Sequence, residues 1–105
     1  MIHLIVLCKL NSEIDDETIE TMAREAQAQL LKIPEVLSVR CGRCLTERAE
    51  WPFYYAVDLE SLQKLELVLD NPIQMRFVTK YVKPNTWNQL ELRYELEPGK
   101  DVRYS

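Results

Sequence analysis

The sequence lacks the features that would assign it to several large classes of proteins. Its 13 Lys and Arg residues stand against 17 Asp and Glu, a formal net charge of −4, and the basic residues are not clustered. Because nucleic acids are bound mainly through clustered basic side chains, we expect no nucleic-acid partner. No apolar run approaches the roughly 18 residues of a membrane span, so we expect no membrane partner either.

Cysteine is also scarce, and the chain begins without a targeting pattern. Three cysteines, an odd number, argue against a disulfide framework. The apolar segment from Met1 to Cys8 meets Lys9 after only about seven residues, with no small-residue cleavage site, which predicts no signal peptide. Together these absences predict reduced thiols and a cytoplasmic location.

What is present is typical of one globular domain. The chain has 105 residues, of which 47% are hydrophobic and 29% charged. These values lie within the globular range and suffice for one hydrophobic core. We therefore assign residues 1–97 to a single α+β domain and residues 98–105 to a polar C-terminal tail.

Hydrophobic periodicity predicts four strands and two helical regions. Strands are expected at residues 2–10, 36–41, 53–59 and about 87–96, the first being apolar on both faces. Asp15 is expected to cap a helix that ends near Pro34, and Ser61 a second, which Asn71-Pro72 restarts. In the last strand we expect Leu90, Leu92, Tyr94 and Leu96 to face the core, and Gln89, Glu91, Arg93 and Glu95 to face solvent.

The resulting order, β-α-β-β-α-β, predicts a ferredoxin-like fold with two helices on one face of a four-stranded antiparallel sheet. The other face would carry apolar side chains of the first strand together with Tyr54 and Ala56. An uncovered apolar face needs a partner, and the commonest partner is a second copy of the chain. We therefore expect a homodimer.

Four segments together resemble the stress-responsive dimeric α/β-barrel family, known as Dabb. They are the first strand around residues 3–9, the region 33–43, the exit of the third strand at 58–62, and the turn at 71–77. The resemblance implies that two protomers pack sheet to sheet into an α/β barrel. It also implies a cavity between the sheet and the helices of each protomer.

The resemblance also places candidate site residues. One plant member of the family, a polyketide cyclase, uses a strand histidine that matches His3, but its second histidine falls on Gln74 and its tyrosine on Val68. An amide has no accessible pKa, so this departure disfavours the same cyclase chemistry. The residues expected to line the cavity are Met22, Ala26, Val68, Gln74, Phe77 and Tyr81. Catalysis, if any, would fall to His3, the only histidine.

Cys41-Gly42-Arg43-Cys44 forms a C-x-x-C pattern that invites a redox or zinc interpretation. The motif ends a predicted strand instead of starting a helix, and four zinc ligands are not assembled by the sequence. We therefore expect no metal and no cofactor.

Three functional hypotheses remain at the level of sequence. The first is a homodimeric protein that binds a small, mainly apolar or aromatic molecule in the cavity without catalysis. The second is an enzyme, a polyketide-cyclase-like or cofactor-independent monooxygenase-like protein, that uses His3. The third is a structural or stress-linked interaction module that acts through its dimer surface. A general base inside the cavity would distinguish the first two.

Overall fold

The computed structural model describes residues 1–96, so the predicted polar tail at 98–105 lies outside the described part. The elements follow the predicted order, and a short π-helical turn and a 3-10 turn extend the second helical region. In chain order they are β1 (Ile2–Leu10), α1 (Asp16–Leu30), β2 (Val36–Arg43), β3 (Phe53–Leu59), α2 (Leu62–Leu69), α3 (Pro72–Phe77), the π turn η1 (Val78–Val82), the 3-10 turn η2 (Lys83–Asn85) and β4 (Thr86–Glu95).

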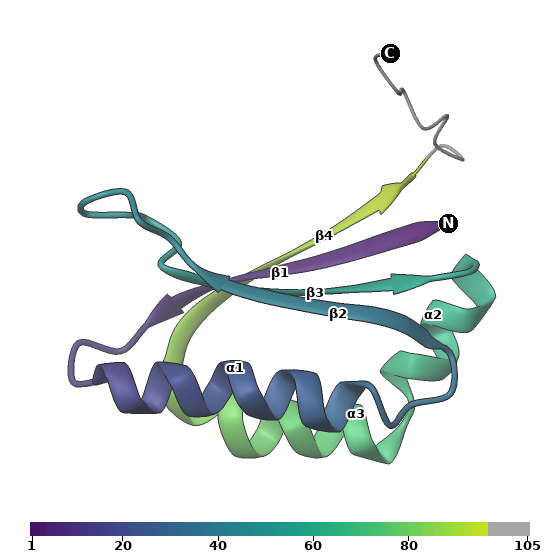
Figure 1. Cartoon of the computed structure of the whole chain (residues 1–105), viewed down its shortest axis with the longest axis horizontal. Coiled ribbons are helices and arrows are strands. Elements are labelled where there is room, and N and C mark those ends of the chain that lie inside the picture. Colours follow the sequence, from purple (N-terminus) through teal and green to yellow (C-terminus); the bar gives the residue numbers. More distant parts are fainter. Residues whose placement is uncertain (97–105) are drawn as a thin grey trace, which may run out of the picture.

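The four strands form one antiparallel sheet in the order β2-β3-β1-β4. Figure 1 shows the helices of residues 1–96 below one face of this sheet, and none of them lies on the opposite face. The first and third strands in sequence, β1 and β3, lie at the centre. This is the ferredoxin-like architecture that the element order predicted.

Each helix begins at the residue that the sequence marked. The side chain of Asp15 accepts hydrogen bonds from the Thr18 N–H (2.8 Å) and hydroxyl (2.6 Å), and these bonds lower the pKa of Asp15. Ser61 caps α2 by accepting from the Lys64 N–H, and Asn71 caps α3. Because a cap satisfies backbone donors that a helix leaves unpaired, these polar residues set the helix boundaries.

The hydrophobic core lies between the helix layer and the face of the sheet that we call the covered face. Alternate residues of β1 and β3 point into it, as expected from the two-residue period of a strand. Its largest fully buried side chains are Phe53, Phe77, Met22, Leu30, Ile33, Leu59, Leu65, Val68, Val82 and Cys8.

The prediction for β4 was wrong about which side faces the core. Glu91 pairs with Val6 and Arg93 with Leu4, and directly paired residues share a face, so these polar side chains lie on the covered face. Leu90, Leu92 and Tyr94 lie on the opposite one. The helices leave the β4 edge largely uncovered, and five of its ten residues are polar and exposed. Residue 96 follows the strand and is exposed.

We call the opposite side of the sheet the open face. It is mainly apolar, although no helix among residues 1–96 covers it. From β1, β3 and β4 it presents Ile5, Leu7, Tyr54, Ala56, Leu90, Leu92 and Tyr94. On β2 it holds Gly42, against which the Tyr54 ring lies so closely that a Cβ at this position would be 2.7 Å from Tyr54 Cε1. The absence of a side chain at Gly42 leaves room for this ring.

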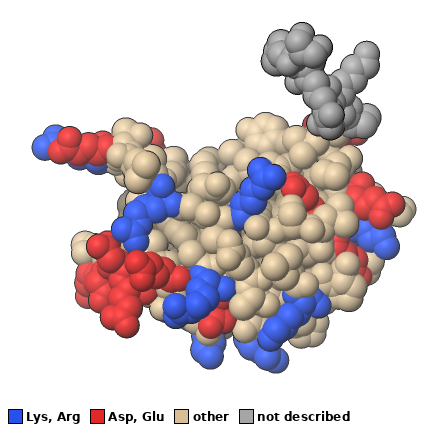
Figure 2. Space-filling view, viewed as in Figure 1, with Lys and Arg blue, Asp and Glu red and all other residues tan. Residues whose placement is uncertain are grey.

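Charge is distributed unevenly over the surface. Figure 2 shows acidic side chains gathered at the start of α1, whereas Lys and Arg side chains are spread over the same view. Asp15, Asp16 and Glu17 are all exposed in that region. No helix among residues 1–96 is long and apolar enough to cross a membrane.

Candidate functional site

His3 lies on the open face, in a small polar cluster near the edge of an apolar surface. Asp58 sits between two partners: His3 Nδ1 forms an ion pair with Asp58 Oδ1, and the Ser38 hydroxyl donates to Asp58 Oδ2 at 2.6 Å. Partial burial alone would raise the pKa of Asp58. The hydrogen bonds from Ser38 and His3, with the charges of His3 and Arg40, outweigh this effect and lower the pKa.

This cluster does not form a nucleophile with its base. The Ser38 hydroxyl donates to Asp58 and not to the imidazole, so His3 has no hydroxyl to activate. His3 also lies across the sheet from the helices, away from the predicted cavity. The structure therefore separates His3 from Gln74 and Tyr81, with which the sequence had grouped it.

The six predicted pocket residues fall into three groups. Met22, Ala26 and Val68 are at most 1% exposed and are packed into the core. Gln74 lines one groove, between the sheet and α3. Phe77 and Tyr81 line another, between α1 and α3. The predicted lining residues are thus divided between the packed core and separate grooves.

The first groove, here called the inner groove, lies between the covered face and the end of the helical region. It has a volume of about 260 Å³. Sheet and helix contribute both apolar and polar side chains to it. The lining residues are Leu4, Val6, Tyr55, Gln74, Val78, Gln89 and Glu91.

Two titratable side chains line the inner groove. Tyr55 is 5% exposed, and its burial, with the nearby Cys8 and Glu91, raises the pKa of its phenol well above the usual value. Tyr55 is therefore a neutral hydroxyl at physiological pH. Glu91 lies 3.4 Å from Arg93 at the open rim. The groove thus combines apolar walls, two amides, one neutral phenol and one carboxylate.

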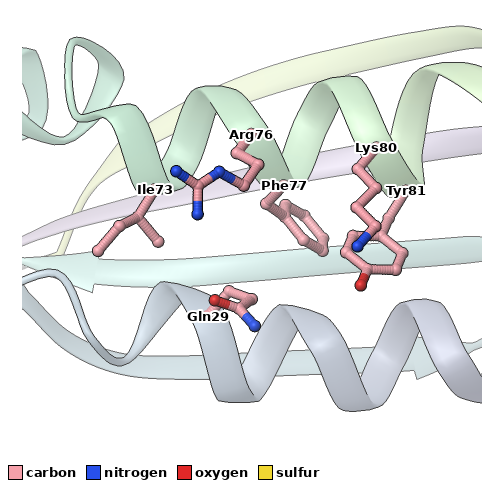
Figure 3. A pocket seen from close by; sticks show the side chains of 6 residues that line it. All are labelled: Gln29, Ile73, Arg76, Phe77, Lys80 and Tyr81. Atoms are coloured by element: carbon pink, nitrogen blue, oxygen red, sulfur yellow. The ribbon is translucent and has the colours of Figure 1, made fainter.

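The second groove, here called the outer groove, lies between the two long helical segments. Figure 3 shows the side chains of α3 and η1 pointing toward α1, where Gln29 meets them. Its volume is about 130 Å³. The lining residues are Gln29, Ile73, Arg76, Phe77, Lys80 and Tyr81.

Aromatic side chains separate the two grooves. The Phe77 ring lines the outer groove and meets the Tyr55 ring edge-on, with 5.3 Å between the ring centroids. Tyr55 in turn lines the inner groove. Each groove therefore has its own lining.

The two cysteines of the C-x-x-C pattern lie in different surroundings. Cys41 faces the helices and its thiol donates to the Ala23 carbonyl (3.4 Å), whereas Cys44 is exposed beyond the end of β2. Burial raises the pKa of the Cys41 thiol, and hydrogen bonds with Thr46 lower that of Cys44. Within residues 1–96 no three ligating side chains gather as a metal ion requires.

Sequence reasoning missed most of the inner groove. Glu91 and Gln89 were assigned to solvent because the apolar residues of β4 were expected to face the helices. Tyr55 was not among the residues expected to line the cavity. One signal was available: Leu4, Val6 and Tyr55 share the parity of the most buried residues on their strands. That parity identifies the sheet floor of any cavity under the helices.

Structures of several proteins are similar to this chain. A Dabb family protein from Mesorhizobium loti is 18% identical, with a TM-score of 0.78 over 91% of this chain and 96% of its own. A dimeric ferredoxin-like protein of unknown function from Thermobifida fusca is 19% identical, with a TM-score of 0.79 over 90% of each chain. The hydroxynitrile lyase of Passiflora edulis is 16% identical, with a TM-score of 0.79 over 94% and 95%.

These identities are low enough that the likeness concerns the fold alone. No curated protein sequence matches the chain significantly. The sequence itself gives the family, because residues 2–91 match the stress-responsive A/B barrel domain. With the four-stranded sheet and its one-sided helix layer, this match over most of the chain shows that the protein belongs to the stress-responsive A/B barrel (Dabb) family.

Proposed function

We propose that the protein is a homodimer in which each protomer binds a small, neutral, mainly apolar molecule in the inner groove. The observation that carries this proposal is the groove itself. It places apolar side chains of β1 beside a few polar groups, the composition expected of a small-molecule site. Its volume of about 260 Å³ suits a ligand of one ring with a short substituent.

The open face supports the dimer. Leu90 and Tyr94 are 39% and 51% exposed in the single chain, beside the half-buried Ile5, Leu7 and Leu92. A contiguous apolar surface of this kind is unusual in a monomer and is typical of an interface. The similar protein from Thermobifida fusca is dimeric, which agrees with this assignment.

The polar groups of the inner groove favour a neutral ligand with a hydroxyl group. The Glu91 carboxylate and the two side-chain amides offer acceptors for such a donor, and Tyr55 offers a neutral phenol. An anionic ligand would be repelled by Glu91. A hydroxyl-bearing aromatic molecule satisfies these groups while its ring contacts Leu4, Val6 and Val78.

Binding without turnover is the better proposal for this groove. His3, the predicted base, lies on the other face of the sheet and cannot reach a ligand bound there. Tyr55 stays protonated at neutral pH and so does not act as a base. Although one similar protein is a hydroxynitrile lyase, the residues that line this groove give no separate support for that activity.

A thermal-shift experiment with 4-butylphenol tests the proposal. A ligand that binds only the folded chain must raise Tm as its concentration increases. Val78→Trp should fill the groove and abolish the rise, whereas Leu67→Trp, at an exposed position of α2, should preserve it. Far-ultraviolet circular dichroism checks that both variants are folded. An unchanged Tm in the parent protein, or an equal rise in Val78→Trp, would contradict the proposal.

A further inference from the structure

The outer groove has no part in the proposed function, yet it holds two cationic side chains beside an aromatic floor. We propose that this groove binds a small aromatic carboxylate, a molecule with one ring and one negative charge. The site is distinct from the inner groove in its lining residues, in its charge and in its ligand. It does not depend on the function proposed above.

The charge of the outer groove favours an anionic ligand. Arg76 and Lys80 are four residues apart along one side of the helical region, and neighbouring like charges at this spacing destabilise a helix. Within residues 1–96, neither forms an ion pair with an acidic side chain. The Glu25 carboxylate accepts a hydrogen bond (3.0 Å) from the side-chain amide of Gln29, which lines the groove. A carboxylate between the two cations would relieve their repulsion and accept their hydrogen bonds.

The floor of the outer groove favours a ligand with an aromatic ring. Phe77 is 1% exposed at the bottom, and the Tyr81 ring lies 5.9 Å from it between centroids, with the planes inclined by 32°. Ile73 adds an aliphatic wall. An apolar cavity of about 150 Å³ is known to hold benzene, so about 130 Å³ is the right scale for a single ring.

The backbone brings two pairs of side chains to one groove. They are the cations Arg76 and Lys80 and the aromatic residues Phe77 and Tyr81. Directly after Phe77 the helix widens into the π turn η1, in which the Lys83 N–H donates to the Val78 carbonyl, five residues back. Such turns are rare and occur frequently at functional sites. Figure 3 shows that Arg76 and Lys80, like Phe77 and Tyr81, project into the same gap toward Gln29. One segment thus supplies both the charge and the aromatic surface.

The two grooves should therefore select ligands of opposite kinds. The outer groove carries two cations and the inner groove a carboxylate. An aromatic carboxylate is suited to the first and repelled from the second. A neutral phenol loses the ionic contacts that the first offers.

The test is a titration of the full chain followed by amide chemical shifts in nuclear magnetic resonance spectra. The probes are benzoate, benzamide, which keeps the ring without the charge, and acetate, which keeps the charge without the ring. We expect benzoate to bind at least about tenfold more tightly than either. The shifts should centre on Gln29 and on residues 76–81. Benzoate that does not bind at 20 mM, or that binds no better than benzamide, would overturn the proposal.

A matched pair of variants tests the cations themselves. Arg76→Gln combined with Lys80→Gln should weaken benzoate binding about tenfold or more, to the level of benzamide. The control, Arg24→Gln combined with Lys64→Gln, removes the same charge from exposed positions of α1 and α2 and should leave the affinity unchanged. Equal weakening in both pairs would show general electrostatic attraction and overturn the site. Because these are surface substitutions, both proteins should fold.

Binding of 4-butylphenol by the Arg76 and Lys80 double variant distinguishes the failure of one proposal from the failure of the other. Loss of benzoate binding with unchanged phenol binding supports two independent sites. Benzoate shifts centred on Leu4 and Glu91 instead of Gln29 would place the anion in the inner groove and overturn the present inference.

Discussion

The two faces of the sheet carry similar apolar sequences but differ in their surroundings. On β1, the covered face presents Ile2, Leu4, Val6 and Cys8, all less than 9% exposed. The open face presents Ile5 and Leu7 from the same strand, which remain half-buried. Alternation therefore predicts a strand with two apolar sides, and only the helix layer decides which side becomes the core.

The difference has energetic consequences. A side chain on the covered face contributes to the stability of one chain by its burial, whereas one on the open face contributes fully only when a second chain covers it. Substitutions on the first should change the free energy of unfolding, and those on the second should change assembly. The following predictions test that distinction, from the largest effect to the smallest.

Phe53→Ala should have the largest effect. The ring is 1% exposed on the covered face, and its removal leaves a cavity in a packed core. We expect a loss of about 3–5 kcal/mol in the free energy of unfolding. Urea denaturation followed by circular dichroism measures it. A loss below about 1 kcal/mol would mean that the covered face is not the core of the single chain.

Leu90→Lys should break the dimer while leaving the chain folded. Leu90 is 39% exposed on the open face, and a lysine there would bury a charge against the second copy. We expect the dimer Kd to rise at least about a hundredfold. Sedimentation velocity measures this. Leu67→Lys, at a 53% exposed position of α2, is the matched control and should leave assembly unchanged. A parent protein that is monomeric at micromolar concentration would refute the dimer.

Asp58→Asn should cost about 1.5 kcal/mol at pH 7, because the charge-assisted bonds from His3 and Ser38 are lost. The folded-state pKa of Asp58 is lowered, so its ionised form stabilises the protein above about pH 4. That contribution is lost as the pH falls through the folded-state pKa. The variant should therefore show a flatter decline of stability below pH 4.

Denaturation at several pH values between 2 and 7 measures this difference. Asp70→Asn, at an exposed position after α2, serves as the control and should follow the parent curve. Parallel acid curves for Asp58→Asn and the parent would show that the cluster contributes nothing to acid stability.

Gly42→Ala should have a smaller effect, about 1 kcal/mol. The new Cβ would approach Tyr54 Cε1 to 2.7 Å, so the ring must move. Addition of Tyr54→Ala removes the clash, and the two substitutions should therefore not be additive. A double-mutant cycle measures the coupling, and full additivity would show that the ring had already moved aside.

Leu45→Ala should change almost nothing. Leu45 is 95% exposed in the loop between β2 and β3, which extends beyond the sheet in Figure 1. We expect a change within about 0.5 kcal/mol. A larger loss of stability at micromolar concentration, absent under monomeric conditions, would place this loop in the interface.

The sequence was sufficient to predict the secondary-structure elements but not the register in which β4 pairs with β1. Asp15, Ser61 and Asn71 marked the helix starts because a cap acts locally, through bonds spanning two or three residues. The face of β4 depends on its register with β1, which lies more than 70 residues away. A pairing between residues so far apart in the sequence leaves no local pattern that identifies the covered side of β4. Each side of this strand faces either a partner or solvent.

The candidate site was predictable only in part for the same reason. The family resemblance placed Gln74, Phe77 and Tyr81 at the expected cavity, and in the structure these residues line grooves. Met22, Ala26 and Val68 were expected to line the cavity, but they are packed into the core. Whether small residues leave a cavity depends on packing across the whole layer.

The π turn η1 makes the outer groove sensitive to chain length. A π turn of this kind can be regarded as an α-helix with one residue inserted, so a deletion at Thr79 would restore ordinary helical spacing. Each residue in an α-helix rotates the next by about 100°. The deletion would turn Lys80 and Tyr81 by about 100° relative to Arg76 and Phe77, from one side of these residues to the other, while leaving every side chain of the groove in the sequence. The loss of a single codon would thus reshape this site in a descendant of the protein without changing any residue that builds it.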